Sequence, residues 1–156
     1  YSDLTTIGLS YQVNEKLLVA VEGSFVQWSE YESLDFDFVN NTERLEDSKN
    51  PRKYEDSPIF RVGGQYSVNS MLDVRAGFYY DQSPITDEFF NPETPNSDNL
   101  GFTAGLTVAP SENLSIDASF LFISGQERES EYQPANFGGK YKSTSVIPGI
   151  GLNYKF

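Results

Sequence analysis

Seven stretches of this chain alternate between apolar and polar residues with a period of two, and this alternation constrains the fold more than any other feature. In a β-strand successive side chains point to opposite faces, so such alternation predicts a strand with one apolar face. The clearest example lies between Asn99 and Ala109, where the apolar positions are Leu100, Phe102, Ala104, Leu106 and Val108. We expect strands at about 3–13, 17–38, 58–68, 72–82, 99–109, 114–124 and 141–156.

The connections between these strands are alternately short and long. Short turns fall near 14–16, 69–70 and 110–113, and long polar connections fall near 40–56, 83–97 and 125–139. An antiparallel meander with this alternation gathers the short turns at one end and the long loops at the other, which is typical of outer-membrane barrels. A soluble β-sandwich is the alternative fold. We therefore predict an all-β protein, an antiparallel up-and-down transmembrane β-barrel meander.

The polar faces of the strands indicate a pore lining. They consist mostly of Ser, Thr, Gly and Gln with single charges, which suits a lumen better than a water-exposed exterior. Because lipid offers no hydrogen-bond partners to the backbone, the sheet has to close. Seven strands would leave two open edges, and single-chain bacterial barrels have an even number of strands. We therefore expect residues 1–156 to be the C-terminal strands of a larger barrel whose N-terminal strands are absent.

Composition speaks against several other classes of protein. No stretch approaches the roughly 18 consecutive apolar residues of a membrane helix. The net charge of −12 is unsuited to nucleic acid, because phosphate binding needs a basic surface. The chain has no cysteine and no histidine, and it contains neither a Gly-x-Ser-x-Gly motif nor a phosphate loop. We expect no catalytic residues, no metal site and no cofactor.

The last residues form a motif of their own. The chain ends at Phe156, and aromatic and aliphatic residues stand two and four places before it, at Tyr154 and Leu152. This pattern resembles the C-terminal assembly signal of outer-membrane barrels. A strand of this kind can be recognised by strand pairing, with alternate side chains presented to an apolar surface. We therefore expect the barrel assembly machinery to be a partner, and an ordinary amphipathic terminal strand is the alternative.

Three short motifs, in order along the chain, resemble the FadL/TodX family of outer-membrane transporters. They are Gln27-Trp28-Ser29-Glu30-Tyr31-Glu32-Ser33-Leu34, Gly77-Phe78-Tyr79-Tyr80-Asp81-Gln82-Ser83-Pro84-Ile85 and Pro95-Asn96-Ser97-Asp98. In the third motif the family usually has Pro-Asp-x-Asp followed by Arg, whereas this chain has Asn96 and Asn99. The resemblance implies a 14-stranded barrel in the bacterial outer membrane with an N-terminal plug, of which this chain would supply the last seven strands. It also implies passive diffusion of hydrophobic molecules such as long-chain fatty acids or aromatic hydrocarbons, with outer-membrane lipid and lipopolysaccharide as partners.

Four charged residues fall within strands on the face expected to line the lumen: Glu22, Arg61, Arg75 and Asp117. Charges removed from water need partners, so cross-strand pairing is one interpretation. The other is that Arg61 or Arg75 receives a fatty-acid carboxylate, since a guanidinium group matches a carboxylate.

Aromatic residues near the long loops are candidates for contacts with a hydrophobic ligand. Trp28 lies near the loop end of its strand, where it could instead belong to an interfacial girdle. Phe89 and Phe90 lie in an acidic, proline-rich loop, either packed beneath it or forming an external capture site. Two other functions remain open: a porin-like or structural barrel, and a soluble β-sandwich binding domain.

Overall fold

A computed structural model of the chain describes all residues except 1–2, 43, 88–89, 91–95 and 133–135. Seven strands form one sheet in the order β1-β2-β5-β6-β7-β8-β11, and each neighbouring pair is antiparallel. The strands are β1 (Leu4–Gln12), β2 (Leu17–Val26), β5 (Ser57–Asn69), β6 (Leu72–Asp81), β7 (Asn99–Ser111), β8 (Leu114–Gly125) and β11 (Thr144–Tyr154). The expected antiparallel meander is confirmed, with strand limits close to those that alternation indicates.

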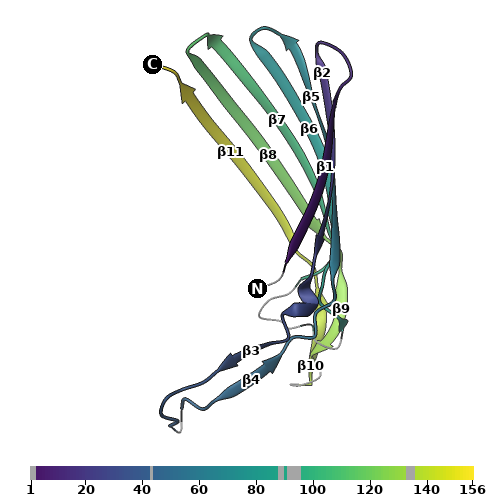
Figure 1. Cartoon of the computed structure of the whole chain (residues 1–156), viewed down its shortest axis with the longest axis vertical. Helices are drawn as coiled ribbons and strands as arrows, with labels where there is room; N and C mark the ends of the chain where they lie inside the picture. The colour runs from purple at the N-terminus through teal and green to yellow at the C-terminus, as the bar shows by residue number, and fades with distance from the viewer. Residues whose placement is uncertain (1–2, 43, 88–89, 91–95, 133–135) are drawn as a thin grey trace.

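The short turns gather at one end of the sheet and the long connections at the other (Figure 1). The expected long strand from 17 to 38 is wrong, because β2 ends at Val26 and a 3-10 turn, η1 (Trp28–Glu30), follows it. The next apolar positions belong to β3 (Ser33–Phe36), which pairs with β4 (Ser48–Pro51) in a separate ribbon. This ribbon projects away from the sheet (Figure 1). Leu34 and Phe36, which lie within the expected long strand, therefore belong to a separate element.

The last long connection also contains a two-stranded ribbon. Here β9 (Arg128–Tyr132) pairs with β10 (Phe137–Tyr141), where the sequence indicated only a loop. Both ribbons lie at the long-loop end of the sheet (Figure 1). Among the described residues no helix is long and apolar enough to cross a membrane.

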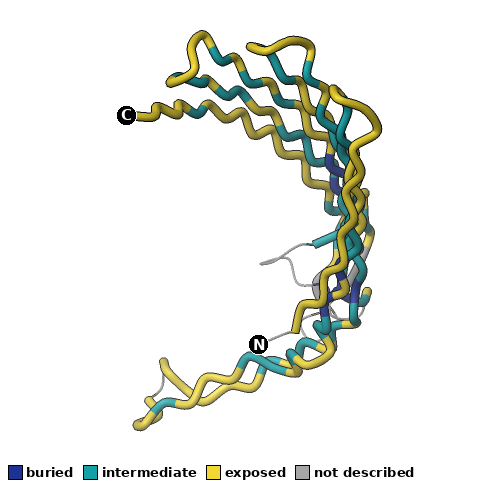
Figure 2. Tube along the Cα trace, turned by 45° about the horizontal axis from the view of Figure 1, so that its top comes forward, coloured by how far each residue is buried: buried dark blue, intermediate teal, exposed yellow. Residues whose placement is uncertain are grey.

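The seven-stranded sheet is curved, with a concave and a convex side (Figure 2). Its edges are β1 and β11, and neither edge strand pairs with another strand on its outer side in the described part of the chain. We call the concave side the inward face and the convex side the outward face. Both edges of the sheet therefore leave a row of backbone N–H and C=O groups without a strand partner in the described part of the chain.

Large apolar side chains cover the outward face, and no element within the described ranges packs over them. Phe102 on β7 is 51% exposed and Leu152 on β11 is 69% exposed, and similar positions occur on the other strands of the sheet. The buried apolar residues among those described are only Val26, Ile85 and Phe90, all at the long-loop end. A soluble sandwich would pack its apolar faces into a dry core. The outward face is instead the apolar band that a membrane barrel presents to lipid.

Candidate functional site on the inward face

A continuous row of uncharged residues crosses the middle of the inward face. Strand register places its members opposite one another from β2 to β11. We call this set the middle row: Ala20, Gly63, Gly77, Thr103, Leu121 and Ile147. Because side chains alternate between faces, these positions share the inward side and interrupt its charged residues.

The small residues of the middle row form the floor of a trough of about 420 Å³. A Cβ atom added to Gly77 would lie 2.6 Å from Thr103 Oγ1, so a larger residue would displace that hydroxyl. A Cβ added to Gly63 would be 3.4 Å from the carbonyl oxygen of Ala76, which is ordinary contact. Glycine at position 63 therefore keeps the trough open and is not required by backbone crowding.

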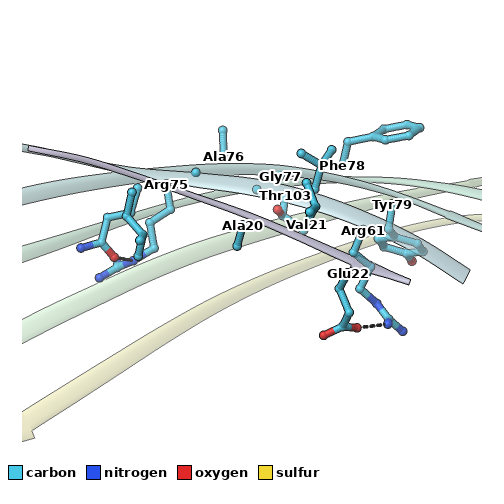
Figure 3. Close-up of a pocket in the computed structure, with 15 residues that line it drawn as sticks. Ala20, Val21, Glu22, Arg61, Arg75, Ala76, Gly77, Phe78, Tyr79 and Thr103 are labelled. Carbon is cyan, nitrogen blue, oxygen red and sulfur yellow. Dashed lines mark hydrogen bonds and ion pairs between the residues drawn. The ribbon is translucent and has the colours of Figure 1, made fainter. Parts of the chain in front are cut away.

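Charged side chains flank the trough on both sides (Figure 3). In the strand register Glu22 and Arg61 lie on the long-loop side of the middle row, and Arg75 lies on its short-turn side. These three point to one side of the sheet, whereas Ala76 and Phe78 point to the other (Figure 3). The ribbons of β8 and β11 bend toward the charged side chains, which identifies their side as the concave, inward one.

On the long-loop side, Arg61 is held in an ion pair. Its Nη1 donates to Glu22 Oε1 directly across the β2–β5 pair. The same nitrogen donates to Ser24 Oγ at 3.0 Å, and Thr6 Oγ1 on β1 donates to Ser24 Oγ at 3.0 Å. The positive charge of Arg61 is therefore compensated by a carboxylate that touches it.

On the short-turn side, Arg75 belongs to a hydrogen-bonded chain that crosses five strands. Its Nε donates to Gln65 Oε1 at 2.8 Å and its Nη1 donates to Thr107 Oγ1 at 2.6 Å. Thr107 donates onward to Asp117 Oδ1, and Asn153 Nδ2 on β11 donates to Asp117 Oδ2 at 2.7 Å. The four charged residues expected on the lumen face thus lie on one face but in two separate groups.

An aromatic ring covers a glycine on the long-loop side of the middle row. Tyr79 on β6 lies directly opposite Gly101 on β7. A Cβ atom added to Gly101 would lie 1.9 Å from Tyr79 Cε1, so the ring occupies the place of a side chain there. Gly101 is buried beneath it.

At the long-loop end, two of the motifs meet through Asp98. Tyr80 Oη donates to Asp98 Oδ2 at 2.6 Å, and the backbone N–H of Ser83 donates to Asp98 Oδ1 at 2.9 Å. Ser83 Oγ also donates to the carbonyl oxygen of Asn96 at 3.3 Å. Pro95 of the third motif lies outside the described residues. This acid therefore ties the start of the loop after β6 to its end.

Arg128 on β9 is a functional candidate that the sequence reasoning missed. Its Nε donates to Asp87 Oδ1 at 2.8 Å, and its two terminal nitrogens donate to the carbonyl oxygens of Ile85 and Asn96. Its guanidinium carbon also lies 5.0 Å from the centre of the Phe90 ring. Two signals could have pointed to it. Arg128 is a lone basic residue between Glu127 and Glu129. In the resembled family an arginine usually follows the third motif, where this chain has Asn99.

The aromatic candidates fall at different places. Phe90 is 1% exposed and packs on Tyr141 of β10 with ring centres 4.7 Å apart, so its ring is buried. Phe89 lies outside the described residues. Trp28 is half-buried in η1, and its ring meets the edge of Tyr54 at 6.2 Å.

The turn that carries Trp28 is held by a carboxylate. Asp56 Oδ1 accepts a hydrogen bond of 2.9 Å from the backbone N–H of Ser29. This hydrogen bond, together with one from the Ser29 side chain, lowers the pKa of Asp56 below its ordinary value. Among the described residues no group of three or more acidic side chains is placed to hold a metal ion.

The family model and the relatives that match this chain point to the same family. The family model described as outer membrane protein transport protein (OMPP1/FadL/TodX) matches residues 1–156. The 47 kDa outer membrane protein of Pasteurella multocida is 25% identical over 94% of this chain and 33% of its own length. The long-chain fatty acid transport protein of an Escherichia coli O6:H1 strain is 28% identical over 66% of this chain and 24% of its own length. The chain thus spans about a third or less of the curated relatives it matches.

Solved structures show the same fold. A Pseudomonas aeruginosa FadL homologue superimposes with a TM-score of 0.83 at 22% identity, covering 97% of this chain and 35% of that one. The Pseudomonas putida toluene transporter TodX gives a TM-score of 0.62 at 22% identity, covering 96% and 33% respectively. The curved meander is therefore a section of a barrel of this kind.

Proposed function

Because the chain belongs to the OMPP1/FadL/TodX family of outer membrane transport proteins, we propose that it forms part of the wall of a barrel through which hydrophobic molecules pass by passive diffusion. Long-chain fatty acids and aromatic hydrocarbons are the proposed substrates, since relatives and structural neighbours carry those names. The protein resides in the bacterial outer membrane, as its relatives do. In this proposal the protein performs no chemical step and acts as a conduit.

The observation that supports this function is the uncharged middle row. A hydrophobic molecule that meets a charged lining has to displace the water bound to it without replacing those hydrogen bonds, which costs free energy. Along the middle row the lining offers methyl groups, glycine backbone and one hydroxyl instead. The trough of about 420 Å³ lies within the size range of small-molecule sites.

The open edges support the proposal that this chain is the C-terminal section of a larger barrel. β1 and β11 each leave one side of the sheet unpaired in the described part of the chain, and backbone groups in lipid have to be paired. Further strands and a plug from an N-terminal region would close the wall and obstruct the lumen. The chain covers only about a third of the length of these relatives, which agrees with this arrangement.

The outward face and the last strand support two partners. Exposed apolar side chains on β7, β8 and β11 suit outer-membrane lipid, with lipopolysaccharide in the outer leaflet. The barrel assembly machinery would recognise the free edge of β11 and the terminal aromatic pair, in which Tyr154 and Phe156 have ring centres 5.2 Å apart. Removing Phe156 should then lower the amount of protein that reaches the membrane, as measured by surface proteolysis.

Two neighbouring glycines provide a matched test of the conduit. Gly63→Ile places a side chain in the trough, and Gly64→Ile places the same side chain on the outward face. Both added Cβ atoms would lie 3.4 Å from a backbone oxygen, so the two variants should fold equally well. In proteoliposomes of the complete protein we expect Gly63→Ile to slow toluene flux about fivefold and Gly64→Ile to change it less than about twofold.

Equal flux in both variants would contradict transport along the middle row. Single-channel conductance tests the porin-like alternative, because an open aqueous pore conducts ions in the absence of substrate. Large, stable conductance steps in the complete protein would favour the porin and contradict the proposed function.

A further inference from the structure

Arg75 and Arg61 flank the same trough but differ in how their charges are compensated. Arg61 touches the carboxylate of Glu22. The two partners of Arg75, Gln65 and Thr107, are both neutral, and no carboxylate oxygen lies within ion-pair distance of its guanidinium group in the described part of the chain. Of these two arginines, Arg75 is therefore the one whose positive charge is available to a ligand.

The neutral partners also fix the direction of that charge. Gln65 holds Nε and Thr107 holds Nη1, so the plane of the guanidinium is set from two sides. Nη2 has no hydrogen-bond partner within the ranges that the structure describes. A planar guanidinium fixed in this way loses little freedom when it binds a carboxylate.

The acids nearest to Arg75 lie on the side away from the trough. Asp117 and Asp73 belong to the next row toward the short turns, where Asp73 pairs with Thr107 in the register. Asp117 already accepts hydrogen bonds from Thr107 and Asn153. The trough side of Arg75 adjoins Gly77 and Gly63 of the middle row, and the acid that lines the trough, Glu22, lies beyond that row in its ion pair with Arg61.

From this arrangement we propose that Arg75 binds the carboxylate of an amphiphilic substrate whose hydrocarbon tail lies along the middle row. This inference rests on the proposed function and makes it specific for monocarboxylate amphiphiles. Charge complementarity identifies the occupant: Arg75 stands at one end of the trough without an ion-pair partner in the described part of the chain, and the charges at the other end, Glu22 and Arg61, neutralise each other. Because the guanidinium group is exposed to water and has acids in the next row, the binding is weak enough for the substrate to leave, as passive transport requires.

The test compares two arginines and two probes in the complete protein in nanodiscs. The probes are palmitate and its methyl ester, which share a hydrocarbon tail and differ in charge. For Arg75→Gln we expect about tenfold weaker palmitate binding and less than about twofold change for the ester. For the double variant Glu22→Gln/Arg61→Gln, which removes the ion pair and leaves no unpaired charge in its place, we expect less than about twofold change for either probe. Heat-modifiable migration on gels checks that each variant is folded.

Each other result overturns the inference in a recognisable way. If Arg75→Gln weakens the binding of both probes equally, or of neither, the carboxylate does not bind Arg75. If Glu22→Gln/Arg61→Gln has the larger effect on palmitate binding, the wrong guanidinium has been assigned. Lower stability of Arg75→Gln with unchanged preference for palmitate would show that Arg75 stabilises the sheet through Gln65 and Thr107 and does not bind the substrate. Failure of the proposed function is distinguishable from these results, because the unaltered protein would then bind and transport neither probe.

Discussion

The contact between Tyr79 and Gly101 predicts a large difference between two glycines on the same strand. Gly101→Ala would place a Cβ atom 1.9 Å from Tyr79 Cε1 and 2.3 Å from Tyr79 Cζ, so the ring has to leave its position. Gly105 faces the same side of β7, but its added Cβ would lie 3.5 Å from the carbonyl oxygen of Ala118, which is ordinary contact. Gly105→Ala is therefore the matched control.

The magnitude follows from two opposing terms. Overpacking of a filled site costs about 1–3 kcal/mol. Replacing glycine by alanine within a strand returns about 0.5–1 kcal/mol, because the unfolded chain loses conformational freedom. We expect Gly101→Ala to lower the free energy of unfolding by about 1–2 kcal/mol, and Gly105→Ala to leave it unchanged or raise it slightly.

Urea unfolding of the complete barrel in lipid vesicles, followed by gel migration of the folded form, measures both values. A double-mutant cycle isolates the cause, since Tyr79→Ala removes the ring and should make Gly101→Ala neutral or stabilising. If Gly101→Ala costs as much with Tyr79→Ala as without it, the ring contact is not the reason for glycine at this position. Equal effects at Gly101 and Gly105 would refute the reasoning as well.

Two further predictions concern the long-loop end. Arg128→Lys keeps the charge but loses the planar guanidinium group, so the free energy of local opening of the loops should fall by about 2 kcal/mol. Hydrogen exchange at the amides of Ser83 and Gln126 should then accelerate about thirtyfold. Unchanged exchange would show that Arg128 does not hold the loops together. The hydrogen bond to Asp56 lowers its pKa in the folded protein, so its stabilisation of the η1 turn is complete above the ordinary carboxyl pKa and is lost as pH falls through the lowered value. Fluorescence of Trp28 should report this loss, and Asp56→Asn should abolish that step of the titration.

The sequence was sufficient for the sheet but not for the ribbons above it. Strands such as β7 must present one face to lipid, so their alternation is strong and their limits were predicted closely. β3 alternates at Leu34 and Phe36 and was merged with β2 into one long predicted strand, whereas β4, β9 and β10 span only four or five residues, too few for alternation to distinguish them from loops.

The candidate site, like the fold, could be predicted from the sequence only in part. Alternation was enough to place Arg75 and Asp117 on one face, because strand parity is local information. That Arg61 is ion-paired while Arg75 is not depends on the register between strands, which a single strand does not reveal. Arg128 was missed because its partners lie about 40 residues away in another loop.

The central claim is that the alternate residues of each strand face lipid and lumen, and spin labels introduced along β7 test it most directly. Single cysteines at positions 100–108, each carrying a nitroxide, would be measured for collision with oxygen, which concentrates in lipid, and with a water-soluble nickel chelate. We predict period-two oscillation, with oxygen collisions highest at Phe102, Ala104 and Leu106, and nickel collisions highest at Thr103 and Thr107. Oscillation of the opposite phase, or uniform access to the nickel chelate, would contradict the membrane barrel and the transport function built on it.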